Sequence, residues 1–118
     1  MGSRWASLVV DAVDPPRLAD WWASVLDYRL LDSSSEEATI GPDEESQPSI
    51  TFLCVAGAKS GKNRLHFDLT PDDREAEVER LVDMGARRVD IGQPEDAAWT
   101  VLADPEGNEF CVLRGKPG

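Results

Sequence analysis

The feature that most constrains this chain is an internal repeat that spans nearly its whole length. A shift of 58 residues, from residue 50 to residue 108, places the apolar segment Ile50–Gly57 over Asn108–Gly115. A shift of 59 residues, from residue 7 to residue 66, places Ser7–Val10 over His66–Leu69. A difference of one residue between the two shifts is small for a repeat that has diverged. We therefore expect two tandem copies of the same folding unit.

Each copy is predicted to contain a strand, a helix and three further strands. The strands are expected where short segments rich in β-branched, aromatic and other apolar residues are bounded by turn-forming residues. The predicted strands are Trp5–Asp11, Tyr28–Leu31, Ala38–Ile40 and Ile50–Val55 in the first copy, and Arg64–Leu69, Arg87–Ile91, Trp99–Leu102 and Asn108–Arg114 in the second.

Both helices carry signals for where they begin and end. In the first copy, Asp14 is a predicted N-cap, two prolines follow it, and Asp27 is the predicted exit. Apolar residues recur there at helical spacing, and they are Leu18, Trp21, Trp22, Val25 and Leu26. In the second copy, Asp72 is the predicted cap and Gly85 the predicted end, with Val78, Leu81 and Val82 on the apolar face.

The last strand follows a strong turn signal, Asp104-Pro-Glu-Gly-Asn108. Asp104 can accept hydrogen bonds from the turn backbone, and Gly107 can adopt the positive φ that closes such a turn. Because strand residues alternate between faces, Glu109, Cys111 and Leu113 are predicted to share one face and Phe110, Val112 and Arg114 the other. One face should pack on a helix, which leaves the face of Cys111 for function.

Composition excludes several classes of function. At 118 residues, 41% hydrophobic and 30% charged, the chain is expected to form one domain, with module one at about 4–56, a linker at 57–62 and module two at about 63–115. The net charge of −11 argues against nucleic acid and against an anionic membrane surface as partners. No membrane span or signal segment is visible, so a cytoplasmic location is expected, with Cys54 and Cys111 as free thiols.

Paired strand-helix-strand-strand-strand units with Asp-Pro-Glu-Gly-Asn before the last strand resemble the vicinal oxygen chelate superfamily, which includes glyoxalase I, bleomycin-resistance proteins and extradiol dioxygenases. The resemblance covers Ser7 to Leu113. It implies an α+β fold in which two tandem βαβββ modules form curled mixed sheets around a cup. It also implies a homodimer.

In the metalloenzymes of that superfamily, each module supplies one metal ligand from its first strand and one from its last. By this resemblance the four positions fall on Ser7, Leu53, His66 and Cys111, while Glu109 lies two residues early. Leucine cannot coordinate a metal and serine is a weak ligand. We therefore expect no metal and no other cofactor, the alternative being a divalent metal held weakly at His66.

Several residues are predicted to contact a small-molecule ligand. They are Trp5, Ser7, Leu53, His66, Trp99, Glu109 and Cys111. Core packing is the alternative role for the tryptophans, and a hydrogen-bonded wall position or a buried apolar position is the alternative for His66 and Cys111. His66 and Cys111 are also the only candidate catalytic residues, as a Cys–His pair.

The sequence therefore predicts a glyoxalase-like protein that binds a small molecule, such as a drug or metabolite, without the metal site of its superfamily. Two alternatives remain open at this point. One is a glyoxalase- or dioxygenase-type enzyme, a lyase or oxidoreductase with an atypical or absent metal. The other is an interaction domain whose cup is vestigial.

Overall fold

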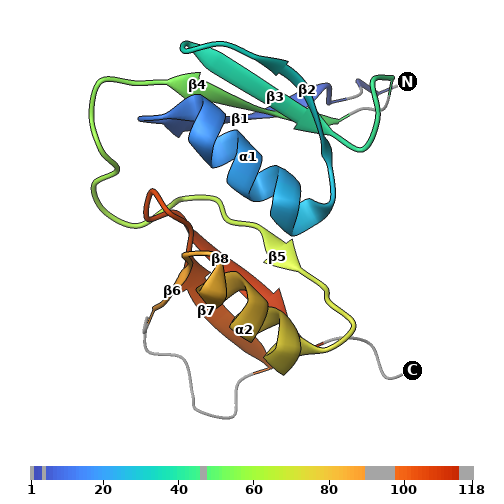
Figure 1. Cartoon of the computed structure of the whole chain (residues 1–118), viewed down its shortest axis with the longest axis vertical. Helices are drawn as coiled ribbons and strands as arrows, with labels where there is room; N and C mark the ends of the chain where they lie inside the picture. The colour runs from blue at the N-terminus through green and yellow to red at the C-terminus, as the bar shows by residue number, and fades with distance from the viewer. Residues whose placement is uncertain (1, 4, 46–47, 90–97, 115–118) are drawn as a thin grey trace. The chain divides into compact units, whose positions relative to one another are not determined.

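The computed structural model of the chain describes residues 2–3, 5–45, 48–89 and 98–114. It divides into two compact units, Met1–Ala58 and Lys59–Gly118, which we call module one and module two because they contain the two predicted modules. Residues 4 and 115, at the predicted outer limits, lie outside the described residues. Each module has one helix and one four-stranded mixed sheet in its described part, so the predicted α+β class and repeated unit are confirmed (Figure 1).

The sheet of module one has the strand order β1-β4-β3-β2. These strands are β1 (Ser7–Ala12), β2 (Arg29–Ser33), β3 (Glu37–Gly41) and β4 (Ser49–Cys54). The first and last strands of the module run parallel, with Ser7 opposite Ser49 and Asp11 opposite Leu53. The remaining pairs are antiparallel. Parallel pairing of strands distant in sequence needs a crossover, which the helix between β1 and β2 supplies.

Helix α1 (Pro15–Leu26) forms as its sequence predicts. The Asp14 side chain accepts a hydrogen bond from the backbone N–H of Arg17 at 3.4 Å, and Asp27 ends the helix in the left-handed conformation with φ 56°. Trp22 is buried and Trp21 is half-buried, and the two rings pack edge to face with their centroids 5.0 Å apart. The helix therefore buries one stripe and leaves Trp21 at its border.

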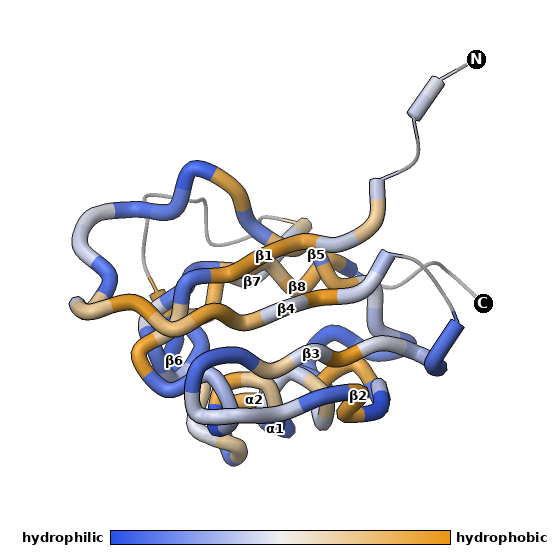
Figure 2. Tube along the Cα trace, turned by 90° about the horizontal axis from the view of Figure 1, so that it is seen from above, coloured by the Kyte–Doolittle hydropathy of each residue, from blue (hydrophilic) through white to orange (hydrophobic). Residues whose placement is uncertain are grey.

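The two faces of the module-one sheet differ in polarity. The buried face carries Ala38, Ile40, Ile50 and Phe52, which are at most 8% exposed and form the core with Leu18 and Trp22 of α1. Figure 2 shows hydrophobic stretches along β1 and β4, and hydrophilic residues in the long connecting segments. Strand alternation puts the partners Ser7–Ser49, Val9–Thr51 and Asp11–Leu53 on the opposite face.

The sheet of module two has the equivalent order β5-β8-β7-β6. Its strands are β5 (Asp68–Leu69), β6 (Arg87–Arg88), β7 (Trp99–Ala103) and β8 (Glu109–Leu113). Strands β5 and β8 are parallel, with Asp68 opposite Cys111, and the other pairs are antiparallel. Helix α2 (Arg74–Asp83) buries Val78 and Leu81. Leu102, Phe110 and Val112 share the sheet face of Thr100, which lines a hollow together with Val78 of α2, so this face lies toward α2. Val101, Ala103 and Cys111 on the other face are buried as well.

The turn before β8 has the predicted construction. Asp104 is 1% exposed, and its Oδ1 accepts from the backbone N–H groups of Glu106 and Asn108, both at 2.9 Å. Its Oδ2 accepts from the side-chain amide of Asn108 at 2.9 Å. Gly107 has φ 89°, a conformation that only glycine adopts without strain. The turn thus fixes where β8 begins, and with it which residues of β8 face each side.

Three element predictions need correction. The N-cap of α2 is Asp73 rather than Asp72, because the carboxylate of Asp73 reaches the Ala76 N–H at 3.2 Å. Strand β5 is shorter than the predicted Arg64–Leu69, and before it the Asn63 side-chain amide donates to the Glu109 carbonyl at 3.2 Å. Val82 is 37% exposed and lies outside the core. The last residues of the predicted strand Arg87–Ile91 lie outside the described residues.

Candidate functional site in module two

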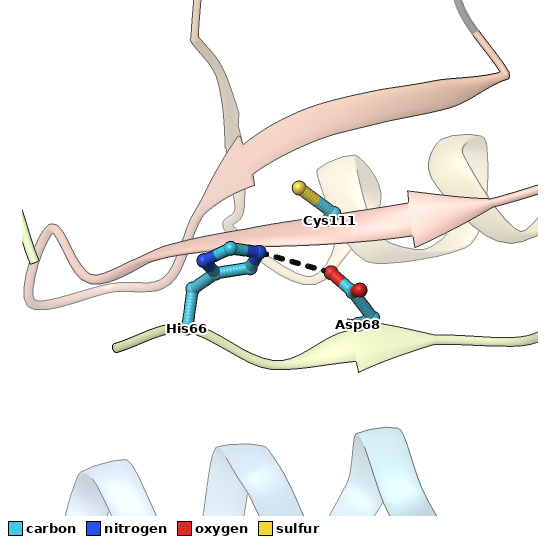
Figure 3. A group of neighbouring side chains, drawn as sticks. All are labelled: His66, Asp68 and Cys111. Atoms are coloured by element: carbon cyan, nitrogen blue, oxygen red, sulfur yellow. Dashed lines mark ion pairs between the residues drawn. The ribbon is translucent and has the colours of Figure 1, made fainter. Parts of the chain in front are cut away.

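His66 and Asp68 form the polar part of the site. His66 lies two residues before Asp68, which is the first residue of β5, and both side chains lie on the same side of the chain (Figure 3). The Nε2 atom of His66 lies 3.0 Å from Oδ1 of Asp68, and both side chains are about half exposed, at 50% and 52%. An imidazole held by a carboxylate and open to solvent is available to a ligand from outside.

Cys111 of β8 completes the group (Figure 3). It is the register partner of Asp68, and its backbone N–H donates to the Phe67 carbonyl at 2.9 Å. Because Phe67 lies between His66 and Asp68 in the chain, this backbone hydrogen bond holds the cysteine beside both residues. One ligand atom from each of the three side chains lies within 4.8 Å of the other two. We call His66, Asp68 and Cys111 the module-two triad.

The surroundings of Cys111 favour its thiol form. Burial raises the pKa of the Cys111 thiol, the neighbouring Asp68 carboxylate raises it further, and the Lys62 ammonium opposes them. A thiolate nucleophile is therefore not favoured, because burial and the Asp68 carboxylate together outweigh the Lys62 ammonium. The triad is better suited to binding than to nucleophilic attack by a free cysteine.

Trp99 shares the face of the triad. In β7 it lies two residues from Val101, and Val101 is the register partner of Cys111. Its side chain is 37% exposed. The face opposite α2 therefore combines an accessible indole with the accessible His66–Asp68 pair.

Glu109 lies on the same face as Cys111 but is engaged in a structural contact. Its Oε2 is 2.9 Å from Nζ of Lys59, and its Oε1 accepts from the Asn63 N–H at 3.1 Å. Burial acts to raise the pKa of Glu109, but the Lys59 and Asn63 interactions outweigh it and lower that pKa below its usual value. The contact anchors the segment that leads into β5.

The remaining predicted site residues belong to module one. Trp5 precedes β1 and is 65% exposed, while Ser7 and Leu53 lie on the sheet face opposite α1. That these residues and the triad share one hollow stays a prediction. His66 and Cys111 are brought together as the repeat predicts.

Sequence reasoning missed Asp68. The signal was present, since alternation along Arg64–Leu69 puts Asp68 on the side of His66. Asp68 is not one of the four positions that the resemblance implies. The Lys59–Glu109 and Asn63–Glu109 contacts were missed as well, because no local sequence pattern predicts contacts between residues so distant in sequence.

Two hollows in module two lie beside α2 and contain none of the triad. One has a volume of about 340 Å³ and is lined by Arg74, Glu75, Val78, Glu79, Arg88 and Thr100. The other, of about 450 Å³, surrounds the start of α2. Both are lined largely by charged and polar residues.

Comparison with known proteins identifies the family. A family model described as a glyoxalase-like domain matches residues 7–113. The chain belongs to the glyoxalase-like domain family. The predicted resemblance to the vicinal oxygen chelate superfamily is thereby confirmed, and solved structures of glyoxalase-like proteins agree with it. No curated protein matches this sequence.

Three solved structures illustrate the shared fold of this glyoxalase-like chain. A glyoxalase-related enzyme from Fulvimarina pelagi is 13% identical, with a TM-score of 0.69 over 95% of this chain and 88% of that one. The trypanothione-dependent glyoxalase I of Leishmania major is 14% identical, with a TM-score of 0.69 over 98% and 88%. A glyoxalase/bleomycin resistance protein/dioxygenase family enzyme from Burkholderia phytofirmans PsJN is 17% identical, with a TM-score of 0.66 over 93% and 97%. At these identities the likeness concerns the fold alone.

The metal site of the superfamily does not fit the residues of this glyoxalase-like chain. Of the four implied positions, Leu53 has no donor atom and Ser7 offers only a neutral hydroxyl. Module one therefore contributes no strong ligand at those positions. Module two contributes His66 and Cys111 and adds Asp68, which the superfamily pattern does not include.

Neither helix in the described part of the chain has the length and apolar character that a membrane span requires.

Proposed function

We propose that this glyoxalase-like chain binds a small molecule, and that it does so without the metal site that its superfamily builds from both modules. The observation that carries the proposal is the composition of one sheet face in module two. That face presents the half-exposed His66–Asp68 pair and the exposed indole of Trp99 on the side opposite α2. Hydrogen-bonding groups beside an aromatic ring are typical of ligand sites.

The charge of the chain favours an aromatic or cationic ligand. With a net charge of −11, the chain attracts cations over a distance of about one Debye length, or about 8 Å at physiological salt. Asp68 supplies a local anion on the binding face, and Trp99 can stack on a ring or on a cationic group. A drug or metabolite that carries an aromatic ring and an amine would satisfy both.

Tryptophan fluorescence tests this proposal. The metal-free full-length chain is titrated with a panel of aromatic and cationic compounds, and a saturable change of emission is the expected result. Trp99→Phe should abolish the change, whereas Trp5→Phe, which removes an exposed indole from module one, should retain it. Asp68→Asn should weaken the binding of cationic members of the panel. An unchanged emission, or a change that depends on Trp5 instead, would contradict the proposal.

A second candidate is a glyoxalase- or dioxygenase-type enzyme, and the His66–Asp68 contact at 3.0 Å favours it. A carboxylate that holds an imidazole orients a general acid or base. His66→Ala should then abolish turnover of a substrate while the circular dichroism spectrum is unchanged. Homodimer formation stays a prediction, and sedimentation equilibrium of the full-length chain measures it.

A further inference from the structure

The module-two triad unites three different donor atoms: an imidazole nitrogen, a carboxylate oxygen and a thiol sulfur. Zinc is the ion whose protein sites most often combine these three donors. We propose that His66, Asp68 and Cys111 form a zinc site contained within module two, with three protein ligands and one coordination position open to solvent or to a ligand. This proposal does not depend on the organic ligand discussed above, because the metal alone tests it.

The distances are close to those that zinc requires. Zinc–nitrogen and zinc–oxygen bonds of about 2.0–2.2 Å in a tetrahedral site place the two ligand atoms about 3.3 Å apart. The His66 Nε2 and Asp68 Oδ1 atoms are 3.0 Å apart, so they would separate by only about 0.3 Å. With a zinc–sulfur bond of about 2.3 Å, sulfur would lie about 3.6 Å from each of them. The sulfur of Cys111, one imidazole nitrogen of His66 and one carboxylate oxygen of Asp68 lie within 4.8 Å of one another.

The backbone holds the three residues in place before any metal arrives. Asp68 and Cys111 are register partners in adjacent parallel strands, and the Cys111 N–H donates to the carbonyl of Phe67, which separates His66 from Asp68. Adjacent strands are about 4.8 Å apart, a span that a single ion bridges with two side-chain ligands. Little ordering entropy remains to be lost on binding, which favours affinity.

Binding balances in protons and charge. The Cys111 thiol loses its proton to the buffer as the thiolate bonds to zinc. The neutral imidazole of His66 retains its one ring proton, which moves to Nδ1 so that Nε2 is free to bind the metal. Thiolate and carboxylate together neutralise the two charges of the ion.

This site differs from the one that the superfamily shares. It uses Asp68, which is outside the four implied positions, and it takes no ligand from Ser7 or Leu53. A sulfur ligand also selects for zinc and cobalt over magnesium and calcium, which prefer oxygen ligands. The expected order of binding follows from the donor set alone.

Cobalt substitution gives a direct spectroscopic test. The full-length chain is treated with chelator, dialysed and titrated with Co²⁺ under anaerobic conditions. One equivalent should produce a thiolate-to-cobalt charge-transfer band in the near ultraviolet and visible bands of tetrahedral intensity, and Zn²⁺ should remove both. Mg²⁺ and Ca²⁺ should leave them unchanged. The absence of a charge-transfer band would overturn the proposal.

Variants identify the ligands. Cys111→Ser should remove the charge-transfer band, whereas Cys54→Ser, which changes the exposed cysteine of module one, should retain it. Because Cys111 is buried and its replacement can disturb folding, His66→Gln and Asp68→Asn provide the second test at half-exposed positions. Each should lower the affinity for Zn²⁺ at least about 100-fold, by analogy with the effect of outer-shell mutations, and alter the visible bands. A band that depends on Cys54, or affinities unchanged in both of these variants, would contradict the proposed site.

Discussion

Replacement of Asp104 by alanine should destabilise the chain substantially. The Asp104 carboxylate is 1% exposed and accepts from two backbone N–H groups at 2.9 Å, those of Glu106 and Asn108. A hydrogen bond to a charged group contributes about 1.5–3 kcal/mol. Even at the lower value, the loss of both bonds lowers the free energy of unfolding by about 3 kcal/mol.

Asparagine at the same position separates the charge from the geometry. Asp104→Asn keeps one acceptor oxygen for the two backbone donors, but its amide group would face the side-chain amide of Asn108. We expect a loss of about 1–2 kcal/mol, smaller than that of the alanine variant. Asp43→Ala is a matched control, since Asp43 accepts from the Glu45 N–H at 2.9 Å in an exposed turn. Its effect should be below about 1 kcal/mol.

Urea unfolding followed by circular dichroism measures these differences. With a slope of about 2 kcal/mol per molar urea, the midpoint of Asp104→Ala should fall by about 1.5 M relative to the unmodified chain. The midpoint of Asp43→Ala should fall by no more than about 0.5 M. If Asp104→Ala and Asp43→Ala have the same small effect, the turn does not fix β8 in the way that its hydrogen bonds indicate.

Three further predictions concern other parts of the chain. The folded-state pKa of Glu109 is lowered, so its carboxylate stabilises the fold above its unfolded pKa of about 4.5, and this stabilisation is lost as pH falls through the folded value. Between pH 7 and about pH 3.5, the free energy of unfolding of Glu109→Gln should therefore change less than that of the unmodified chain. An equal change in the two proteins would contradict this prediction. Trp22→Ala, at a side chain 2% exposed, should cost about 3–5 kcal/mol in urea unfolding, and a cost below about 1 kcal/mol would show that α1 is not anchored there. Gly107→Ala should lower the free energy of unfolding by about 1–2 kcal/mol because Gly107 has a positive φ. Gly57 also lies in open space but has no positive φ, so Gly57→Ala should be nearly neutral in the same assay. Equal effects of the two substitutions would show that the φ of Gly107 is not what constrains the turn.

Local patterns predicted much of this fold, because they act over a few residues. The Asp14 cap, the Asp27 exit and the Asp104 turn each depend on neighbours within about four positions. The repeat added the pairing of His66 with Cys111, since equivalent strands in the two copies occupy equivalent places. Strand alternation then gave the buried Phe110 and Val112 and the separate face of Cys111.

The parts that could not be predicted depend on contacts distant in sequence or on the exact backbone angles. Asn63 and Glu109 are 46 positions apart, and two hydrogen bonds between them connect the segment before β5 to the first residue of β8. The choice between Asp72 and Asp73 as helix cap depends on which carboxylate reaches the Ala76 N–H, a matter of backbone angles. Asp68 is a different case, because its alternation with His66 was readable and only its pairing with Cys111 required the sheet register.

The central claim is that the chemistry of this chain is concentrated on one sheet face of module two, at His66, Asp68 and Cys111. X-ray absorption at the zinc edge of the full-length chain, loaded with one equivalent of Zn²⁺, tests it most directly. We predict one sulfur neighbour at about 2.3 Å together with nitrogen and oxygen neighbours at about 2.0–2.2 Å, with the sulfur absent in Cys111→Ser and present in Cys54→Ser. A zinc environment of oxygen and nitrogen alone in the unmodified chain would contradict the claim.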